Sequence, residues 1–84
     1  MRLDKFLKVS RVIKRRTLAK EVCDSGHVQV NNRVVKASLE VKPGDKVEIS
    51  FGSRKTCFEI LEIKETVPAK EAASLYKIIE QGSC

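Results

Sequence analysis

The sequence contains a single histidine, no tryptophan and only three cysteines, at positions 23, 57 and 84. A catalytic histidine needs a nucleophile and an orienting partner, and a zinc site needs closely spaced Cys and His ligands. His27 has only Cys23 nearby, at the expected end of a helix, where nothing lowers a thiol pKa. The odd, scattered cysteines do not form a disulfide framework, and we interpret Cys23 and Cys57 as small buried apolar residues. We therefore expect a protein that is not an enzyme, with no metal and no cofactor.

The four glycines are scattered at positions 26, 44, 52 and 82, so no glycine-rich loop can cradle a phosphate. Apolar runs are short as well, and none approaches the ~18 residues that span a bilayer. In the first segment, MRLDKFLKVSR, charged residues interrupt every apolar run, which excludes the core of a signal peptide. We expect a cytoplasmic protein without a membrane partner.

Positive charge is concentrated in the first half of the chain. Residues 1–36 contain ten Lys and Arg against three Asp and Glu, a net charge of +7, whereas residues 37–84 contain seven against eight, a net charge of −1. The segment RVIKRRTLAK, residues 11–20, has five basic residues and no acidic one. Such asymmetry indicates a polyanionic partner, either nucleic acid or an anionic membrane, although an inert basic face is the simpler alternative.

Two helices are predicted in this basic half. Leu3, Phe6 and Leu7 form an apolar stripe at helical spacing, and Ser10 marks an end or a cap. A second helix runs roughly over 15–24 and stops at Gly26. Leu18, Ala19, Val22 and Cys23 share its apolar face, with Arg16 and Lys20 on the flank of that face. We therefore expect the basic side chains to lie along the edge of this apolar face, at positions fixed by the packing of that face on the core.

Strands follow the helices. Val28 and Val30 alternate, Asn31-Asn32 turns the chain, and Val34-Val35 returns it. Pro43-Gly44 suits a type II turn, and Val47, Ile49 and Phe51 alternate in the next strand. Gly52-Ser53 suits a type II′ hairpin turn into a last strand over 54–64, where a change of phase indicates a bulge near Ile60.

A final helix is expected from Pro68 to Gly82, with an apolar stripe of Ala72, Leu75, Tyr76 and Ile79. We interpret the stripe as packing on the sheet; the alternative is a helix that docks a partner. The fold class is therefore a small single α+β domain, with two N-terminal helices packed on a short antiparallel or mixed sheet and a C-terminal helix. We assign residues 1–64 to the domain, with its core motif in 1–50, and 65–84 to a helical tail packed on it.

The motifs RLDKFL at 2–7, SR at 10–11, KRRTLA at 14–19, VN at 30–31 and VKPGD at 41–45 resemble the S4-type RNA-binding domain, first described in a small-subunit ribosomal protein. Asn32 departs from the glycine usual there, but asparagine tolerates the left-handed conformation. The whole chain is similar to the family of ribosome-associated quality-control factors to which RqcP belongs, and is related to the heat-shock ribosome-binding protein. This resemblance implies binding to a stalled large ribosomal subunit, at ribosomal RNA and the anticodon arm of peptidyl-tRNA, in support of alanine tailing by the partner RqcH.

Arginine suits phosphate and guanine because its planar fork donates two parallel hydrogen bonds. The expected RNA contacts are Arg2, Arg11, Arg15, Arg16 and Lys20, with Lys5, Lys14 and Lys36 as weaker candidates. Asp4 is interpreted as a helix-start residue or as the partner that orients Arg2 or Lys5. We expect the free protein to be a monomer.

Other functions are left open by the residues. Two short basic helices could enter the DNA major groove, but Glu21 and Asp24 on the second helix would repel phosphate. The few aromatic residues fall at core positions, so platforms for stacking single strands are poorly supplied. The alternatives are a general RNA- or tRNA-binding protein or heat-shock ribosome-recycling protein, a basic module that binds an acidic protein, and an RNA-targeting domain for a separate enzyme.

Overall fold

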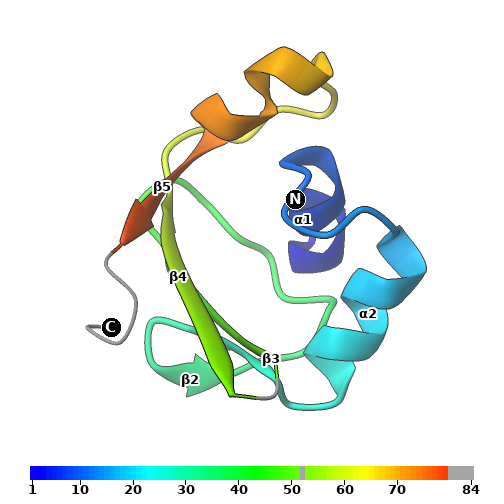
Figure 1. The fold of residues 1–84 in the computed structure, drawn as a ribbon, viewed down its shortest axis with the longest axis vertical. Coiled ribbons are helices and arrows are strands. Elements are labelled where there is room, and N and C mark those ends of the chain that lie inside the picture. The colour runs from blue at the N-terminus through cyan, green and yellow to red at the C-terminus, as the bar shows by residue number, and fades with distance from the viewer. Residues whose placement is uncertain (52, 80–84) are drawn as a thin grey trace.

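The computed structural model describes residues 1–51 and 53–79. In that part, helices lead, strands follow, and a short 3-10 helix precedes the last strand (Figure 1). The elements are α1 (Leu3–Val9), α2 (Arg16–Asp24), β1 (Val28–Val30), β2 (Arg33–Val34), β3 (Lys46–Phe51), β4 (Arg54–Ile60), η1 (Ala69–Leu75) and β5 (Tyr76–Ile79).

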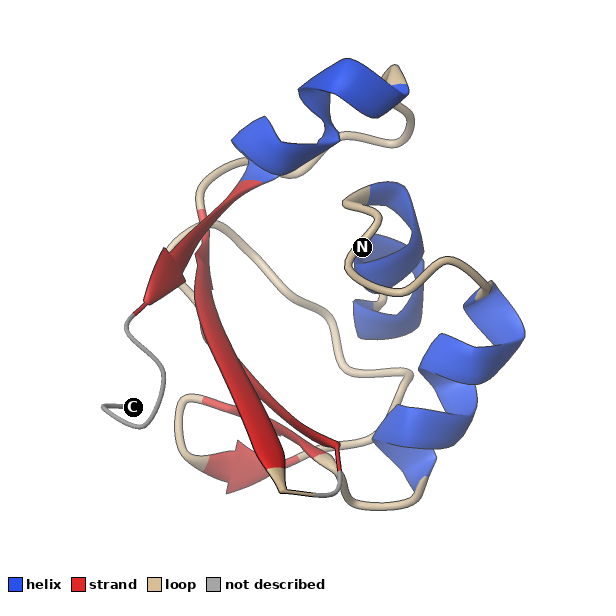
Figure 2. Cartoon of the chain, in the orientation of Figure 1, coloured by secondary structure: helices blue, strands red, loops and turns tan. Residues whose placement is uncertain are grey.

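The strands form one sheet in the order β2-β1-β3-β4-β5, with every pairing antiparallel. Both α-helices cover one face of this sheet (Figure 2). The core lies between these layers, and Phe6 of α1 stacks on Phe58 of β4 with ring centroids 6.3 Å apart. The predicted α+β class is confirmed, with an antiparallel rather than a mixed sheet.

The apolar stripe of α1 is confirmed, since Leu3, Phe6 and Leu7 are fully buried. Helix α2 begins one residue later than predicted, at Arg16, and Gly26 follows its end with a φ of 84°. Its buried face consists of Ala19, Val22 and Cys23. Leu18 was placed on that face wrongly, because 44% of it is exposed. The face of α2 that packs on the core is therefore narrower than the face predicted from an ideal helical wheel.

Local turn chemistry determines the hairpins. Asn31 and Asn32 have φ values of 52° and 68°, the two left-handed residues of a type I′ turn between paired Val30 and Arg33. Asn32 thus serves where glycine was expected. The type II turn at Pro43-Gly44 is also confirmed, because Gly44 has a φ of 96° and the Asp45 N–H donates to the Lys42 carbonyl over 3.1 Å.

The connection between β3 and β4 joins paired Phe51 and Arg54, as a two-residue hairpin requires. The predicted type II′ turn and the Phe51 side chain lie outside the described residues. Strand β4 ends at Ile60 rather than at residue 64. Directly after it, the N–H groups of Leu61 and Glu62 both donate to the Leu75 carbonyl, over 2.8 and 3.3 Å. Two residues opposite one is the arrangement of a β-bulge, near the predicted place.

The predicted C-terminal helix is wrong for residues 76–79. After one short 3-10 segment, Ala69–Leu75, the chain becomes strand β5 and pairs with β4, with Tyr76 opposite Ile60. The backbone groups along β4 need partners, and the β-prone sequence Tyr-Lys-Ile-Ile supplies them. Ala72 and Leu75 are buried, so packing of the tail on the domain is confirmed. The expected end at Gly82 lies outside the described residues.

Cys23 is buried and free, and its pKa is raised to about 11 by burial and by the charges of Asp4 and Asp24. Cys57 is also buried, as the sequence analysis expects. No helix among residues 1–51 and 53–79 is long and apolar enough to cross a membrane.

Replacing Leu75 by alanine tests the role of the tail. The Leu75 side chain is fully buried, and its carbonyl accepts the bulge hydrogen bonds. Leu75→Ala should lower the free energy of unfolding by about 2–5 kcal/mol, since truncation leaves a cavity in a small core. Denaturant unfolding measures this change. A loss within about 0.5 kcal/mol, with weaker binding to ribosomes, would instead make the tail an interaction surface.

Candidate nucleic-acid interface

The start of α1 is tied to a distant segment of the chain. The N–H groups of Leu3 and Asp4 donate to the carbonyls of Leu39 and Ala37, over 2.8 and 3.3 Å. These are N–H groups of the first helical turn, which have no partner within a helix. Residues 37–39 therefore fix the position of the Asp4 backbone at the start of α1.

The Asp4 carboxylate links the two α-helices. Its side chain is only 3% exposed, and its Oδ1 accepts a hydrogen bond from the Lys5 N–H over 2.8 Å. Arg2 Nε lies 3.2 Å from Oδ1, and Arg16 Nε, from α2, lies 3.6 Å from Oδ2. A carboxylate in the first turn also suits the helix dipole. Asp4 thus holds one arginine before α1 and another at the start of α2.

Both guanidinium groups remain available to a ligand. The Arg2 and Arg16 side chains are 47% and 52% exposed, although their partner is buried. Each contact to Asp4 is made through the single Nε–H, so it does not consume the four N–H donors on the terminal nitrogens. Those donors are the ones that bind phosphate or a guanine edge in a forked pair.

A hollow of about 420 Å³ lies at this point, lined by Arg2, Asp4, Arg16, Thr17 and Lys20. We call it the basic hollow. It brings together three of the predicted contacts, and its three cations and one carboxylate leave a net charge of +2. Thr17 adds a hydroxyl that the sequence analysis did not select. The hollow suits a phosphate group that several fixed donors approach at once.

The remaining predicted contacts lie outside the basic hollow. Lys5 pairs with Glu65, and this hydrogen bond lowers the pKa of the Glu65 carboxyl. Lys36 donates to the Asp24 carbonyl over 3.0 Å, at the end of α2, where a cation suits the helix dipole. Both lysines therefore have structural partners. Their prediction as RNA contacts stays untested.

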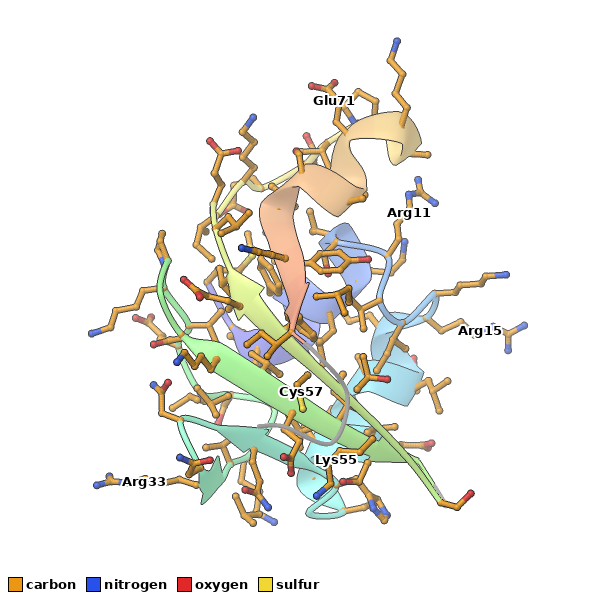
Figure 3. All side chains as sticks on the ribbon, turned by 60° about the vertical axis from the view of Figure 1, so that its left-hand side comes forward. Arg11, Arg15, Arg33, Lys55, Cys57 and Glu71 are labelled. Atoms are coloured by element: carbon orange, nitrogen blue, oxygen red, sulfur yellow. The ribbon has the colours of Figure 1, made fainter. Side chains whose placement is uncertain are left out.

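Arg11, Lys14 and Arg15 are exposed around the connection between the α-helices. Arg11 follows the end of α1 with a φ of 61°, a left-handed conformation that is uncommon for arginine. Figure 3 shows Arg11 and Arg15 on one side of the molecule and Arg33, from β2, on the opposite side. The connection therefore extends the basic surface beyond the hollow, whereas Arg33 does not contribute to it.

No group of three or more His, Cys, Asp or Glu within residues 1–51 and 53–79 is placed to bind a metal. His27 is exposed, next to the end of α2. In this part of the chain the arrangement consists of fixed cations around one buried carboxylate, which is suited to binding an anion rather than to transferring protons.

The S4 domain family model matches residues 1–47, the segment that carries α1, α2 and the first hairpin. This chain belongs to the S4 domain family. The match identifies the basic half as an RNA-binding domain, which confirms the resemblance stated from the motifs.

Relatives match over nearly the whole chain. An "RQC P-site tRNA stabilizing factor" from Bacillus subtilis is 52% identical over 81 residues, covering 96% of this chain and 94% of that protein. A protein of the same name from Halalkalibacterium halodurans is 58% identical over 78 residues, covering 93% and 89%.

Solved structures share the fold. The trimeric heat shock protein 15 of Vibrio cholerae superposes with a TM-score of 0.86 at 31% identity, covering 94% of this chain and 81% of that one. The solution structure of the hypothetical protein HP1423 superposes with a TM-score of 0.81 at 35% identity, covering 95% and 98%.

Asp4→Asn tests whether the carboxylate positions the arginines. Asparagine keeps an oxygen for the Lys5 N–H but removes the charge that holds Arg2 and Arg16. Ordering one long side chain costs about 0.5–1.5 kcal/mol, so affinity for purified tRNA or large subunits should fall by about 1–3 kcal/mol. Equilibrium binding at fixed salt measures the change.

Glu21→Gln is the matched control, because it adds the same unit of charge on the exposed side of α2, beside Lys20. We expect it to leave affinity unchanged or to raise it. If Asp4→Asn also raises affinity, Asp4 only repels the ligand and does not position the arginines.

Proposed function

We propose that this protein is an RNA-binding factor of ribosome-associated quality control. It binds the stalled large ribosomal subunit at ribosomal RNA and at peptidyl-tRNA, stabilises the tRNA in the P site, and supports alanine tailing of the nascent chain with RqcH. It acts in the cytoplasm and catalyses no reaction. The observation that carries the proposal is the basic hollow, formed by Arg2, Asp4, Arg16, Thr17 and Lys20 inside an S4 domain. Two relatives named "RQC P-site tRNA stabilizing factor" are 52% and 58% identical over almost the whole chain and support the proposal.

The geometry supports recognition of folded RNA. The arginines of the hollow start from backbone that is anchored by buried residues, Leu3 and Phe6 on α1 and Ala19 and Val22 on α2. Their donors are therefore arranged before the ligand arrives, which reduces the entropy lost on binding. Phosphates held at fixed spacing in a folded RNA match such donors better than a flexible strand does.

A second candidate is a general ribosome-binding role like that of the heat-shock protein. The fold match to the Vibrio cholerae protein, at a TM-score of 0.86, favours it. The two functions differ in their dependence on RqcH. Deleting the gene that encodes this protein should abolish alanine tails on stalled nascent chains if the first function holds. The tails should stay intact if only the second function holds.

Ribosome sedimentation with point variants tests the proposal. Tagged protein should migrate with free large subunits, and ribonuclease should release it. Arg16→Ala should lose about 1–3 kcal/mol of affinity for large subunits, because the variant removes a forked contact to phosphate or guanine. Arg16→Lys should recover only part of the binding, since an ammonium group cannot make the forked pair.

The affinity of wild-type protein should also decrease with salt, with a log–log slope of about −3 to −5 for four to six neutralised phosphates.

Lys55→Ala is the control, because Lys55 lies on β4, pairs with Glu48 at 3.9 Å and is half exposed. It should bind like wild type. The melting temperature of Lys55→Ala should stay close to wild type, as expected for an exposed charge away from caps and core. Arg16→Ala should lower the melting temperature, because it removes one of the two cations beside the buried Asp4 carboxylate. Loss of binding in Lys55→Ala but not in Arg16→Ala would place the RNA on the sheet. An affinity that does not change with salt would exclude RNA as the partner.

A further inference from the structure

An apolar hollow of about 500 Å³ lies beside the connection between α1 and α2. Its lining includes the buried side chains of Ile49 and Phe58 from the sheet. Val12 of the connection, with Tyr76 and Ile78 of β5, lines the rest of the apolar surface, and the polar residues Thr56 and Arg11 complete the lining. This hollow shares none of its lining residues with the basic hollow.

The hollow exists because residues 76–79 form a strand and not a helix. In β5, Tyr76 and Ile78 are two residues apart and therefore point to the same face of the sheet. Their cross-strand partners Ile60 and Phe58 are fully buried, so this is the face that α1 covers. Ile78 is nevertheless 53% exposed, since β5 is an edge strand. An aromatic and an aliphatic side chain are thus presented at the border of the helical layer.

The Tyr76 ring is held in place. It packs against Phe58 with ring centroids 5.2 Å apart and the planes tilted by 59°, and it is partly buried against the core. Phe58 in turn stacks on Phe6 of α1. A ring fixed in this way can accept a flat ligand on its free surface with little loss of side-chain entropy.

Arg11 gives the hollow a cation at its margin. The residue stands in the left-handed conformation, and Figure 3 shows its side chain on the same side of the molecule as Arg15. The hollow therefore adjoins the basic surface formed by the exposed residues Arg11, Lys14, Arg15 and Arg16. An apolar, partly aromatic surface beside a guanidinium matches a nucleotide, which combines a flat base with an anionic phosphate.

We propose that this hollow binds an unpaired nucleotide of the bound RNA, with the base against Tyr76 and its phosphate on Arg11. The proposal rests on the function proposed above and extends it from phosphates of folded RNA to a base at a loop, bulge or strand end. An apolar side chain of a protein partner would not use the cation of Arg11, so the charge favours the nucleotide.

Tyrosine fluorescence provides a direct readout. The chain contains one tyrosine and no tryptophan, so its emission reports on Tyr76 alone. Two RNA hairpins with the same stem serve as probes, one blunt and one with a short run of unpaired adenosines. The second hairpin should quench the emission at saturation, and the blunt hairpin should not.

Variants separate the base contact from the basic surface. Tyr76→Leu should lower affinity for the hairpin with unpaired adenosines by roughly 5- to 150-fold, the range expected when a stacking ring is removed, and leave the blunt hairpin unaffected. Tyr76→Phe keeps the ring and should bind like wild type. Arg11→Gly should selectively weaken the same hairpin, and glycine adopts the φ of 61° without strain.

Lys77→Ala is the matched control, because Lys77 is exposed between Tyr76 and Ile78 and points to the other face of the sheet. It should bind both hairpins like wild type. If Tyr76→Leu and Arg11→Gly bind each hairpin with the affinity of wild type, and the wild-type emission is not quenched, the nucleotide site is overturned and the hollow is left to a protein partner.

The two proposals fail differently. If Arg16→Ala weakens both hairpins while the Tyr76 and Arg11 variants do not, the nucleotide site is wrong and the proposed function stands. If Arg16→Ala weakens neither, the proposed function fails. Melting curves show whether Tyr76→Leu is folded; where it is not, Arg11→Gly decides the outcome.

Discussion

The buried carboxylate of Asp4 is the interaction on which the candidate interface depends. It lies at the start of α1, is 3% exposed, and contacts guanidinium groups from both sides of the α1–α2 junction. An isolated buried carboxylate would be costly, and here a backbone N–H and two cations compensate it. The same contacts hold Arg2 and Arg16 at fixed positions on the surface. Stability of the helix start and order of the binding groups are thus coupled through one side chain.

Burial and charge place opposite requirements on the helices, and each helix meets them on different faces. In α2, Ala19, Val22 and Cys23 face the core, while Arg16, Thr17 and Lys20 line the basic hollow. A domain of 84 residues has a small core and little stability to spare, so it cannot build a deep cleft. A shallow arrangement of pre-ordered cations, beside an apolar hollow under β5, is a recognition surface that such a small fold can support.

The sequence predicts those features that depend on local chemistry. The periodicity of Leu3, Phe6 and Leu7, the Asn31-Asn32 turn and the Pro43-Gly44 turn are properties of short segments. The last segment is different, because the spacing of Ala72, Leu75, Tyr76 and Ile79 fits a helix. The decision for a strand comes from the distant β4, whose backbone groups pair with residues 76–79.

The candidate site was predictable only in part. Arg2 and Arg16 lie in the quoted motifs, Lys20 was selected from its place beside Arg16 on the helix, and Asp4 was selected as a partner of Arg2. The contact between Asp4 and Arg16 depends on how α1 and α2 pack against each other, and no spacing in the sequence encodes this packing. Tyr76 was assigned to the core for the same reason that β5 was missed.

A double-mutant cycle on RNA affinity tests the central claim most directly. Affinity for purified large subunits is measured for wild type, Asp4→Asn, the Arg2→Ala/Arg16→Ala pair, and all three changes together. If Asp4 acts by holding the two arginines, its replacement should weaken wild type but have no such effect once both arginines are absent. Equal losses from Asp4→Asn in both backgrounds would contradict the account and show that Asp4 acts independently of the arginines.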